Sequence, residues 1–327
     1  MRHSAWFAAI VAALLSQAPA GAQAQSGTIR FVVGTVAGGA IDPYARLIAE
    51  HMQRTLGQTI IIDNRPGAGG NLAAGYIVEQ PADGTLIWVG TQAFTEINPN
   101  AFKSLRWSID DFIPLIRGVE APLVFVAHPS VPANSLSEFV KWAEANKGKL
   151  SYASYQPGTP SHFLGYQLND KFKLDLTHVP YRGSGLQANA LVGGHSQFGF
   201  AQVNSSAPHI EAGKLKGFAI TSAQRWKALS QVPTFAELGH PEFTARVWFG
   251  LLVKKGTPEP IISRLTEAAK AAHNDPEIRK KLEAQGYEVS GATGPAQLLS
   301  NIKEQQERWG KLVKASGFSA EDRGSTQ

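Results

Sequence analysis

The sequence contains no cysteine among its 327 residues. Without thiols the chain can form neither disulfide bonds nor thiolate metal sites, and a lipid anchor attached to a cleavage-site cysteine is excluded. Beyond the N-terminal segment, no apolar run is long enough to cross a bilayer as a helix. The 31 Lys and Arg residues are scattered among 26 Asp and Glu residues, so their pattern does not favour binding to nucleic acid.

Residues 1–24 have the pattern of a secretory signal peptide. A basic start at Arg2 precedes an apolar run over residues 5–15 and the A-x-A site Ala22-Gln23-Ala24. We expect cleavage after Ala24, which lowers the formal net charge from +5 to about +4. An N-terminal membrane anchor is the alternative, but the run is too short for a stable span. The sequence therefore predicts a freely diffusing exported protein, most simply located in the periplasm.

Strand and helix patterns alternate along the mature chain, which predicts an α/β fold with mostly parallel sheets flanked by helices. We expect strands at residues 28–33, 59–63, 85–89, 123–127, 150–154, 176–179, 197–201, 215–221 and 248–253. We expect helices at residues 42–56, 72–79 and 135–142, from 162 and 186 onward, and at 258–274, 276–285 and 295–315. The last helix is expected to pack against the first lobe, and residues 320–327 to fray. The chain is expected to cross between two lobes near residues 127 and 247.

A glycine-rich turn after the first strand is the strongest sign of a binding site. Asp42 is placed as the N-cap of the following helix and Pro43 in its first turn. Gly38 and Gly39 leave the backbone N–H groups open to a ligand, and the helix dipole favours an anion such as a carboxylate. Asn71 is expected to cap the helix after a second glycine-rich turn over residues 64–70.

Two further turns repeat this plan, at residues 154–161 and 181–184. Turns at the carboxyl ends of strands in two lobes would build one shared polar cleft. Arg182 can pair with a carboxylate or face solvent, and Asp42 can contact a ligand or act only as a cap. His162 fits a packing or hydrogen-bonding role better than that of a base. The polar loop over residues 202–206, with Gln202 and Asn204, can read polar groups of a ligand or be solvated.

Enzyme signatures are poor. Gly183-Ser184-Gly185 is shorter than the five-residue nucleophile elbow, and the glycines after Pro66 lack the lysine of a phosphate loop. No two histidines have the helical spacing of metal ligands, so we expect neither a metal nor another cofactor. A serine hydrolase using Ser161 or Ser184 stays open as a minor hypothesis.

Several motifs together carry a resemblance to a known family. They are Gly38-Gly39-Ala40-Ile41-Asp42 with Ala45-Arg46, Asn64-Arg65-Pro66-Gly67-Ala68-Gly69-Gly70-Asn71, Pro81-Ala82-Asp83-Gly84-Thr85-Leu86, Tyr152-Ala153-Ser154 through Ser161-His162, His178-Val179-Pro180-Tyr181-Arg182-Gly183, Val232-Pro233-Thr234 and Trp248-Phe249-Gly250-Leu251. From about residue 29 to 318 the chain resembles the solute receptors of tripartite tricarboxylate transporters, the Bug family. It departs from the family pattern in Gly34-Thr35-Val36-Ala37, where a proline-rich run is usual, in Ala201, where an acidic residue is common, and in Arg182, where lysine is usual.

The resemblance implies a periplasmic flytrap fold, type II-like, with lobe 1 formed by residues 25–126 and 247–327 and lobe 2 by residues 127–246. It implies that the turns at residues 34–42 and 154–161 hold one carboxylate group of the ligand, partly through water. The ligand would be a dicarboxylate, a tricarboxylate, an acidic amino acid or an aromatic acid. The predicted ligand-binding residues are Thr35, Val36, Gly38, Gly39, Ile41, Asp42, Gln92, Phe94, Ser154, Tyr155, Gly158, Thr159, Ser161, His162, Arg182, Gly183, Ser184, Ala201, Gln202 and Asn204.

The resemblance also implies a partner. A monomeric receptor would close around the carboxylate and deliver it to the membrane permease subunits of a tripartite tricarboxylate transporter. A receptor that serves a signalling membrane protein instead is the alternative, since both roles use the same fold and ligand.

Overall fold

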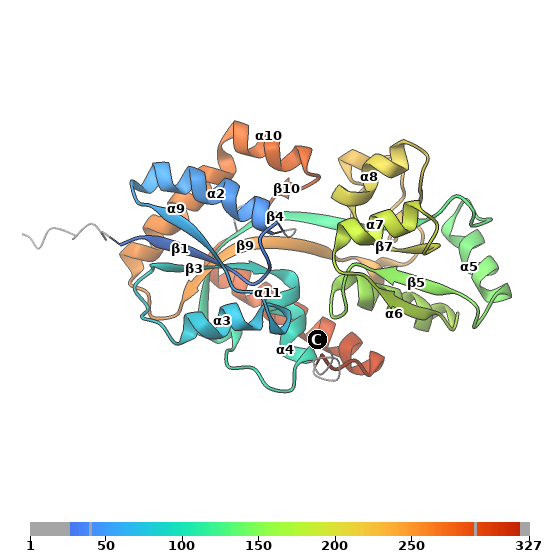
Figure 1. Cartoon of the computed structure of the whole chain (residues 1–327), viewed down its shortest axis with the longest axis horizontal. Helices are drawn as coiled ribbons and strands as arrows, with labels where there is room; N and C mark the ends of the chain where they lie inside the picture. The colour runs from blue at the N-terminus through green and yellow to red at the C-terminus, as the bar shows by residue number, and fades with distance from the viewer. Residues whose placement is uncertain (1–26, 39–40, 291–292, 321–327) are drawn as a thin grey trace, which may run out of the picture.

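The computed structural model describes residues 27–38, 41–290 and 293–320. The predicted signal peptide and Gly39 lie outside these ranges. Two α/β lobes lie side by side along the long axis of the molecule, and strands β4 (Phe112–Ala127) and β9 (Arg246–Lys254) run between them (Figure 1). No helix within the described ranges combines the length and the apolar character that a membrane span requires.

Lobe 1 is built on three parallel strands in the order β2 (Ile60–Asn64), β1 (Ile29–Val33) and β3 (Leu86–Thr91). These strands are rich in β-branched residues, and β1 and β3 are almost wholly buried, as in a sheet covered on both faces. Strand β9 pairs antiparallel with β3, and β4 pairs antiparallel with β9 and with the short β10 (Glu288–Val289). The lobe's helices are α2 (Asp42–Leu56), α3 (Asn71–Val78), α4 (Asn98–Ala101), α9 (Glu259–Asn274) and α10 (Pro276–Ala284).

Lobe 2 repeats this plan with the parallel strands β6 (Thr177–Pro180), β5 (Ser151–Ser154) and β7 (Phe198–Gln202). Strands β7 and β8 (Lys216–Ile220) pair antiparallel with the second half of β4. The lobe's helices are α5 (Leu136–Ala145), α6 (Pro160–Phe172), α7 (Ser184–Val192) and α8 (Val203–Glu211). Shorter turns of helix lie at Ala68–Gly70, Ala93–Ile97 (a π-turn, η2), Ile109–Asp111, Lys227–Leu229 and Pro241–Phe243 (η5).

The chain passes from lobe 1 to lobe 2 inside β4. This strand pairs with β9 up to Pro122 and with β7 and β8 from Leu123 onward. Because β4 carries the chain outward and β9 returns it, the two crossing strands run in opposite directions. Each sheet therefore combines three parallel strands with the antiparallel crossing strands, and helices flank the sheets in the predicted two-lobed α/β architecture.

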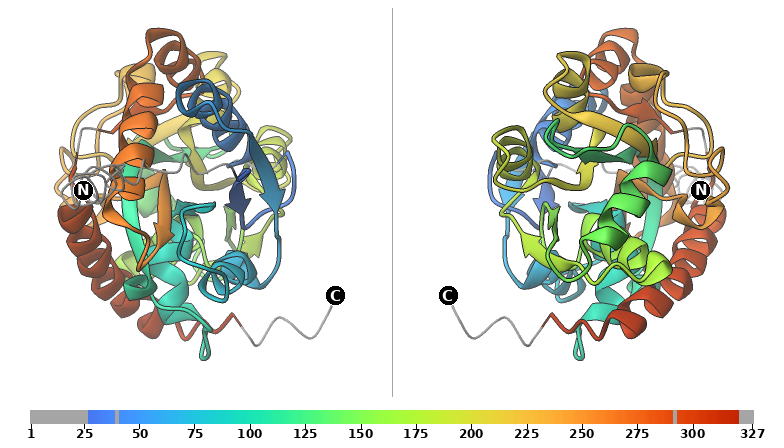
Figure 2. Two further views of the ribbon diagram at one scale, coloured as in Figure 1. Left: turned by 90° about the vertical axis from the view of Figure 1, so that its left-hand side faces the viewer. Right: turned by 90° about the vertical axis from the view of Figure 1, so that its right-hand side faces the viewer.

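Helix α11 (Pro295–Ser316) runs along the outside of the molecule and is peripheral in both end-on views (Figure 2). Its buried residues Ile302 and Trp309 face the interior, as the amphipathic spacing predicts. The helix does not pack against lobe 1 alone, because the Tyr166 hydroxyl of α6 donates to the Ala315 carbonyl oxygen at 2.7 Å. The Ala320 N–H donates to the Ala101 carbonyl oxygen at 2.9 Å, so the expected fraying does not begin at residue 320. Residues 321–327 lie outside the described ranges.

Three local predictions were wrong. The residues before α2 and α3, Ile41 and Gly70, hold the N-cap positions, and Asp42 and Asn71 are already helical. Gly70 has a φ of 92°, a backbone conformation that asparagine adopts less readily than glycine. Residues 203–206 form the start of α8 rather than a loop, and the hydroxyl groups of Ser205 and Ser206 donate back to the Gln202 carbonyl oxygen.

A ligand cleft between the two lobes

A cleft of about 690 Å³ opens where the carboxyl ends of the six parallel strands face each other. Its size falls in the range of small-molecule binding sites, and its place is where open α/β sheets bind their ligands. Lobe 1 contributes the loops after β1, β2 and β3, and lobe 2 those after β5, β6 and β7. Residues 247–249 of β9 also line it.

Twelve of the predicted ligand-binding residues line this cleft. They are Thr35, Val36, Ile41, Gln92, Phe94, Tyr155, Gly158, Thr159, Arg182, Gly183, Ser184 and Gln202. The structure therefore brings together side chains from both lobes that lie more than 150 positions apart in the sequence. Gly38, Asp42, Ser154, Ser161, His162, Ala201 and Asn204 are not among the lining residues.

Asp42 lies behind the first loop and braces it. Its carboxylate accepts hydrogen bonds from the Gly38 N–H at 3.1 Å, from Arg46 Nε at 2.8 Å and from Asn64 Nδ2 at 3.2 Å. Burial opposes ionisation, but these hydrogen bonds outweigh it and lower the pKa of Asp42. The arrangement connects Gly38, the last described residue of the first loop, to the first turn of α2.

Ser154, Ser161 and His162 lie beneath the loop after β5. The Ser154 hydroxyl contacts His178 Nε2 at 2.7 Å, and the Ser161 hydroxyl donates to the Phe200 carbonyl oxygen. His162 Nδ1 accepts from the Gly158 N–H at 3.3 Å, and its ring stacks on His178 with a centroid distance of 4.0 Å. These three residues shape the loop from behind.

The other two residues outside the lining lie in or beside β7. Ala201 is fully buried in the sheet, where a longer acidic side chain would have no solvent. Asn204 Nδ2 donates to the Tyr287 hydroxyl at 3.4 Å and so connects α8 to the segment before β10.

Five helices begin at the cleft, and this shared geometry decides its electrostatics. Their N-cap residues all line the cleft, and none makes a side-chain cap hydrogen bond: Ile41 of α2, Gly70 of α3, Thr159 of α6, Gly183 of α7 and Gln202 of α8. A helix N-terminus presents N–H groups without intrahelical partners and about half a positive charge. The cleft therefore attracts anions through its backbone.

The side chains add little charge. Arg182 is the one charged residue among the described residues that line the cleft, and its side chain is exposed. The same lining contains no His, Asp, Glu or Lys, so Ser184 has no neighbouring base within it. The arrangement suits recognition of a charged ligand and lacks the groups of a nucleophilic active site.

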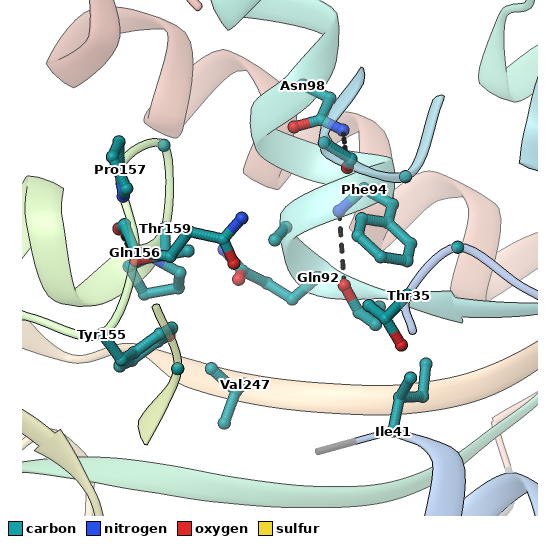
Figure 3. A pocket seen from close by; sticks show the side chains of 18 of the residues that line it. Thr35, Ile41, Gln92, Phe94, Asn98, Tyr155, Gln156, Pro157, Thr159 and Val247 are labelled. Carbon is teal, nitrogen blue, oxygen red and sulfur yellow. Dashed lines mark hydrogen bonds between the residues drawn. The ribbon is translucent and has the colours of Figure 1, made fainter. Parts of the chain in front are cut away.

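Several buried polar atoms of the cleft lack a hydrogen-bond partner. Within the described ranges they are the Thr35 hydroxyl, both polar atoms of the Gln92 amide and the Gln202 Oε1 atom. Gln92 is only 1% exposed, and Figure 3 shows its side chain pointing toward the middle of the pocket. An unpaired buried polar group costs about 1–3 kcal/mol. A ligand or ordered water that satisfies these atoms would recover that cost.

Aromatic and aliphatic side chains form the rest of the wall. Phe94 packs between the cleft and Trp88, whose ring lies nearly parallel to it at 6.4 Å. Glycine is required opposite Phe94, because a Cβ on Gly70 would lie 2.5 Å from the Phe94 ring. Val36 is 61% exposed at the same cleft.

Sequence reasoning missed part of the lining: the turn after β2, the residues Thr91, Asn98, Ala101, Phe102 and Pro180, the β9 residues Val247, Trp248 and Phe249, and the C-terminal Phe318 and Ala320. The lining residues Ala93, Gln156, Pro157, Pro160 and Tyr181 lie within loops predicted at the cleft, although they were not named as ligand-binding residues. The glycine-rich turn after β2 is visible in the sequence, and its Gly69 carbonyl oxygen accepts from Asn98 Nδ2 at 2.9 Å. Phe318 had no local signal, because only tertiary packing against His162 and Phe163 brings it to the cleft.

Two lobes joined by crossing strands, with a cleft at the carboxyl ends of both sheets, define a solute-binding protein. The profile of the family described as "Tripartite tricarboxylate transporter family receptor" matches residues 44–318. The chain belongs to this family.

Relatives agree in sequence and in structure. Protein BugT of Bordetella pertussis is 30% identical over 295 residues, which cover 88% of this chain and 89% of BugT. The structure of MatC from Rhodopseudomonas palustris with bound malate superposes with a TM-score of 0.77 at 33% identity and covers 88% of this chain and 98% of MatC. That of R. palustris Rpa4515 with adipate gives a TM-score of 0.79 at 30% identity, with coverage of 89% and 98%.

Proposed function

We propose that this protein captures a small organic carboxylate in the cleft and delivers it, as a periplasmic receptor, to a tripartite tricarboxylate-type membrane transporter. The observation that carries the proposal is the convergence of five helix N-termini without side-chain caps on one cleft. A carboxylate supplies the acceptors that such termini lack. The bound malate and adipate of the two relatives support this ligand class.

The ligand combines its carboxylate with a hydrocarbon or aromatic body. Phe94, Phe102, Val247, Phe249 and Phe318 offer an apolar surface to such a body. The unpaired amide of Gln92 adds one place for a further polar group or a bridging water. A di- or tricarboxylate, an acidic amino acid and an aromatic acid all meet these requirements, and the experiment below separates them.

Capture proceeds by closure of the two lobes. The ligand contacts loops of both lobes, while β4 and β9 provide the connection about which they move. Binding shifts the population toward the closed form, because the closed form makes contacts with the ligand from both sides. The closed, monomeric receptor then docks on the permease and releases the ligand unchanged.

The test is a binding screen with the mature chain from Gln25 onward. Thermal unfolding and calorimetric titration are followed with malate, adipate, citrate, glutamate and benzoate, each beside its uncharged amide. One class of carboxylate should raise the unfolding temperature, since a ligand at 100 times its Kd adds about 2.7 kcal/mol of stability. The matched amide should give no shift.

Two outcomes contradict the proposal. Equal shifts with carboxylate and amide would show that the cleft does not read the charge. Chemical conversion of the ligand during incubation, followed by chromatography, would show an enzyme instead of a receptor.

A further inference from the structure

A second cavity of about 240 Å³ lies at the hinge, outside the ligand cleft. It is open to solvent and lies between β4, β9 with the two residues before it, α11 and the π-turn after β3. Its lining residues are Glu96, Arg117, Thr244, Ala245, Arg246, Asn301, Glu304, Gln305, Arg308 and Trp309. We call it the hinge cavity. Trp248 separates the two spaces, since it lines the cleft while its Nε1 donates to Glu96 Oε1 at 2.7 Å.

Two buried hydrogen-bond donors in the hinge cavity lack acceptors. Arg117 Nε and Trp309 Nε1 are buried and, within the described part of the chain, make no hydrogen bond. Trp309 is 1% exposed, and although its indole stabilises the ionised form of Glu96, the two do not reach hydrogen-bond geometry. Among the described residues, Arg308 donates to two uncharged acceptors, the Glu242 carbonyl oxygen at 3.0 Å and Gln305 Oε1 at 3.4 Å. Buried donors without partners are costly, so this arrangement favours an added acceptor.

The charges point the same way. Arg117 and Arg246 share one carboxylate, because each contacts a different oxygen of Glu120. Arg308 forms no ion pair within the described residues, and Glu304 is exposed at the cavity. Burial raises the pKa of Glu96 to about 7, against hydrogen bonding from Trp248 and attraction by Arg117. Protonation of Glu96 removes one of the two carboxylates that line the cavity, so its three guanidinium groups retain Glu120, Glu288 and the exposed Glu304 as counter-charges and the cavity becomes more positive by one charge.

We infer that the hinge cavity is a binding site for a small inorganic oxyanion, which accepts hydrogen bonds from Arg117, Arg308 and Trp309. Guanidinium groups match oxyanions in geometry and remain charged when partly buried. The volume holds an oxyanion with a few waters, since one water occupies about 30 Å³ in the liquid.

The position of the site gives it a consequence for the receptor. Thr244, Ala245 and Arg246 follow η5 on the way out of lobe 2, whereas Glu96 and Arg117 belong to lobe 1. An anion held between them bridges the strands about which the lobes move. Because Trp248 and Glu96 form the shared wall, occupancy of the hinge cavity and of the cleft are coupled, and such coupling is reciprocal.

The experiment titrates the mature chain with sulfate by calorimetry at fixed ionic strength. Sulfate keeps one charge state between pH 6 and 8, so any pH dependence belongs to the protein. We expect saturable binding that is tighter at pH 6 than at pH 8. Glu96 faces Arg117 of β4 and Arg308 of α11, and at pH 6 its carboxyl group is protonated and no longer repels an anion. Trp309→Phe removes one donor and keeps an aromatic ring, and Arg308→Gln removes the unpaired charge. Each variant should weaken sulfate binding at least 10-fold.

Arg106→Gln is the matched control, because it removes an exposed charge of lobe 1 and should bind sulfate as the unaltered chain does. Arg182→Gln removes the charge of the cleft and reports any sulfate that binds there instead. The inference is overturned if the unaltered chain shows no saturable binding, if Arg308→Gln and Trp309→Phe bind as well as it does, or if Arg182→Gln alone abolishes binding. If Arg308→Gln fails to fold, Trp309→Phe decides. None of these outcomes depends on the identity of the cleft ligand.

Discussion

The hydrogen-bonded pair Trp248 and Glu96 separates the cleft from the hinge cavity, yet the two sites obtain their polarity in different ways. The cleft draws its attraction for anions from helix N-termini and has Arg182 as the one charged side chain of its described lining. The hinge cavity, about a third as large, has five charged side chains in its lining. A site built from the backbone keeps its charge preference while its side chains vary, whereas a site built from side chains depends on each of them.

Among the described helices, side-chain caps occur away from the cleft but not at every helix there. Ser135 caps α5 through the Glu138 N–H and Asp275 caps α10 through two N–H groups, whereas α9 and α11 begin without a side-chain cap. The five helices that begin at the cleft all lack one, and losing a cap costs about 1 kcal/mol per helix. At the cleft, a ligand carboxylate can take the place of the missing caps.

The first prediction concerns Glu96, the buried carboxyl group between the cleft and the hinge cavity. Glu96 has a pKa of about 7 in the folded chain against an ordinary 4.5, so the folded state binds more protons between these values. The free energy of unfolding therefore falls as pH rises from about 4.5 to 7, by about 3 kcal/mol, and stays lowered above pH 7. Glu96→Gln keeps an acceptor for Trp248 and removes this pH dependence. The unfolding free energy of the variant minus that of the unaltered chain should therefore be about 3 kcal/mol larger at pH 8 than at pH 4.

Urea unfolding of both chains between pH 4 and 8 measures this difference. Glu304→Gln, an exposed glutamate at the same cavity, should follow the unaltered chain. If the unfolding free energies of Glu96→Gln and the unaltered chain change with pH in the same way, the pKa of Glu96 is not raised by burial.

The second prediction deforms the cleft without touching a charge. Gly70 has a φ of 92°, and an added Cβ would lie 2.5 Å from the Phe94 ring. Gly70→Ala therefore combines backbone strain with overpacking and should cost about 2 kcal/mol of stability. It should also displace Phe94 and weaken carboxylate binding more than 10-fold.

Gly185→Ala is the matched control. Gly185 lies in the first turn of α7, and an added Cβ would meet nothing within 4 Å. Thermal unfolding and calorimetry should find this variant unchanged or slightly more stable, because alanine favours a helix over glycine. If both variants behave alike, the contact between Gly70 and Phe94 does not shape the cleft.

The sequence predicted the backbone part of the cleft well. Helix α2 has the predicted bounds, 42–56, and the predicted turns at the ends of β1, β5 and β6 all reach the lining. The reason is that strand patterns and glycine turns are local signals, and the carboxyl ends of parallel strands must meet at one edge. The individual helix starts were less predictable, since Asp42 looks like a cap and in fact braces the loop through Gly38 and Arg46.

The rest depends on contacts that no local pattern records. Phe318 reaches the cleft only because α11 extends to α6, and the unpaired atoms of Gln92 follow from how the π-turn η2 packs. The hinge cavity unites residues of η2, β4, β9 and α11 that are up to 213 positions apart, from Glu96 to Trp309. Their charges look like ordinary surface charges in the sequence.

The smallest effect is expected from the lone charge of the cleft. Arg182 is exposed, so its attraction for a bound carboxylate is screened, and Arg182→Gln should cost about 1 kcal/mol of binding, roughly fivefold in Kd. Calorimetry at low and high salt should show that the variant loses part of the salt dependence, and Arg182→Lys should retain it. Abolished binding in Arg182→Gln would reverse the contrast between the two cavities. The cleft would then depend on one side chain, as the hinge cavity does, and the helix N-termini would position a ligand that Arg182 attracts.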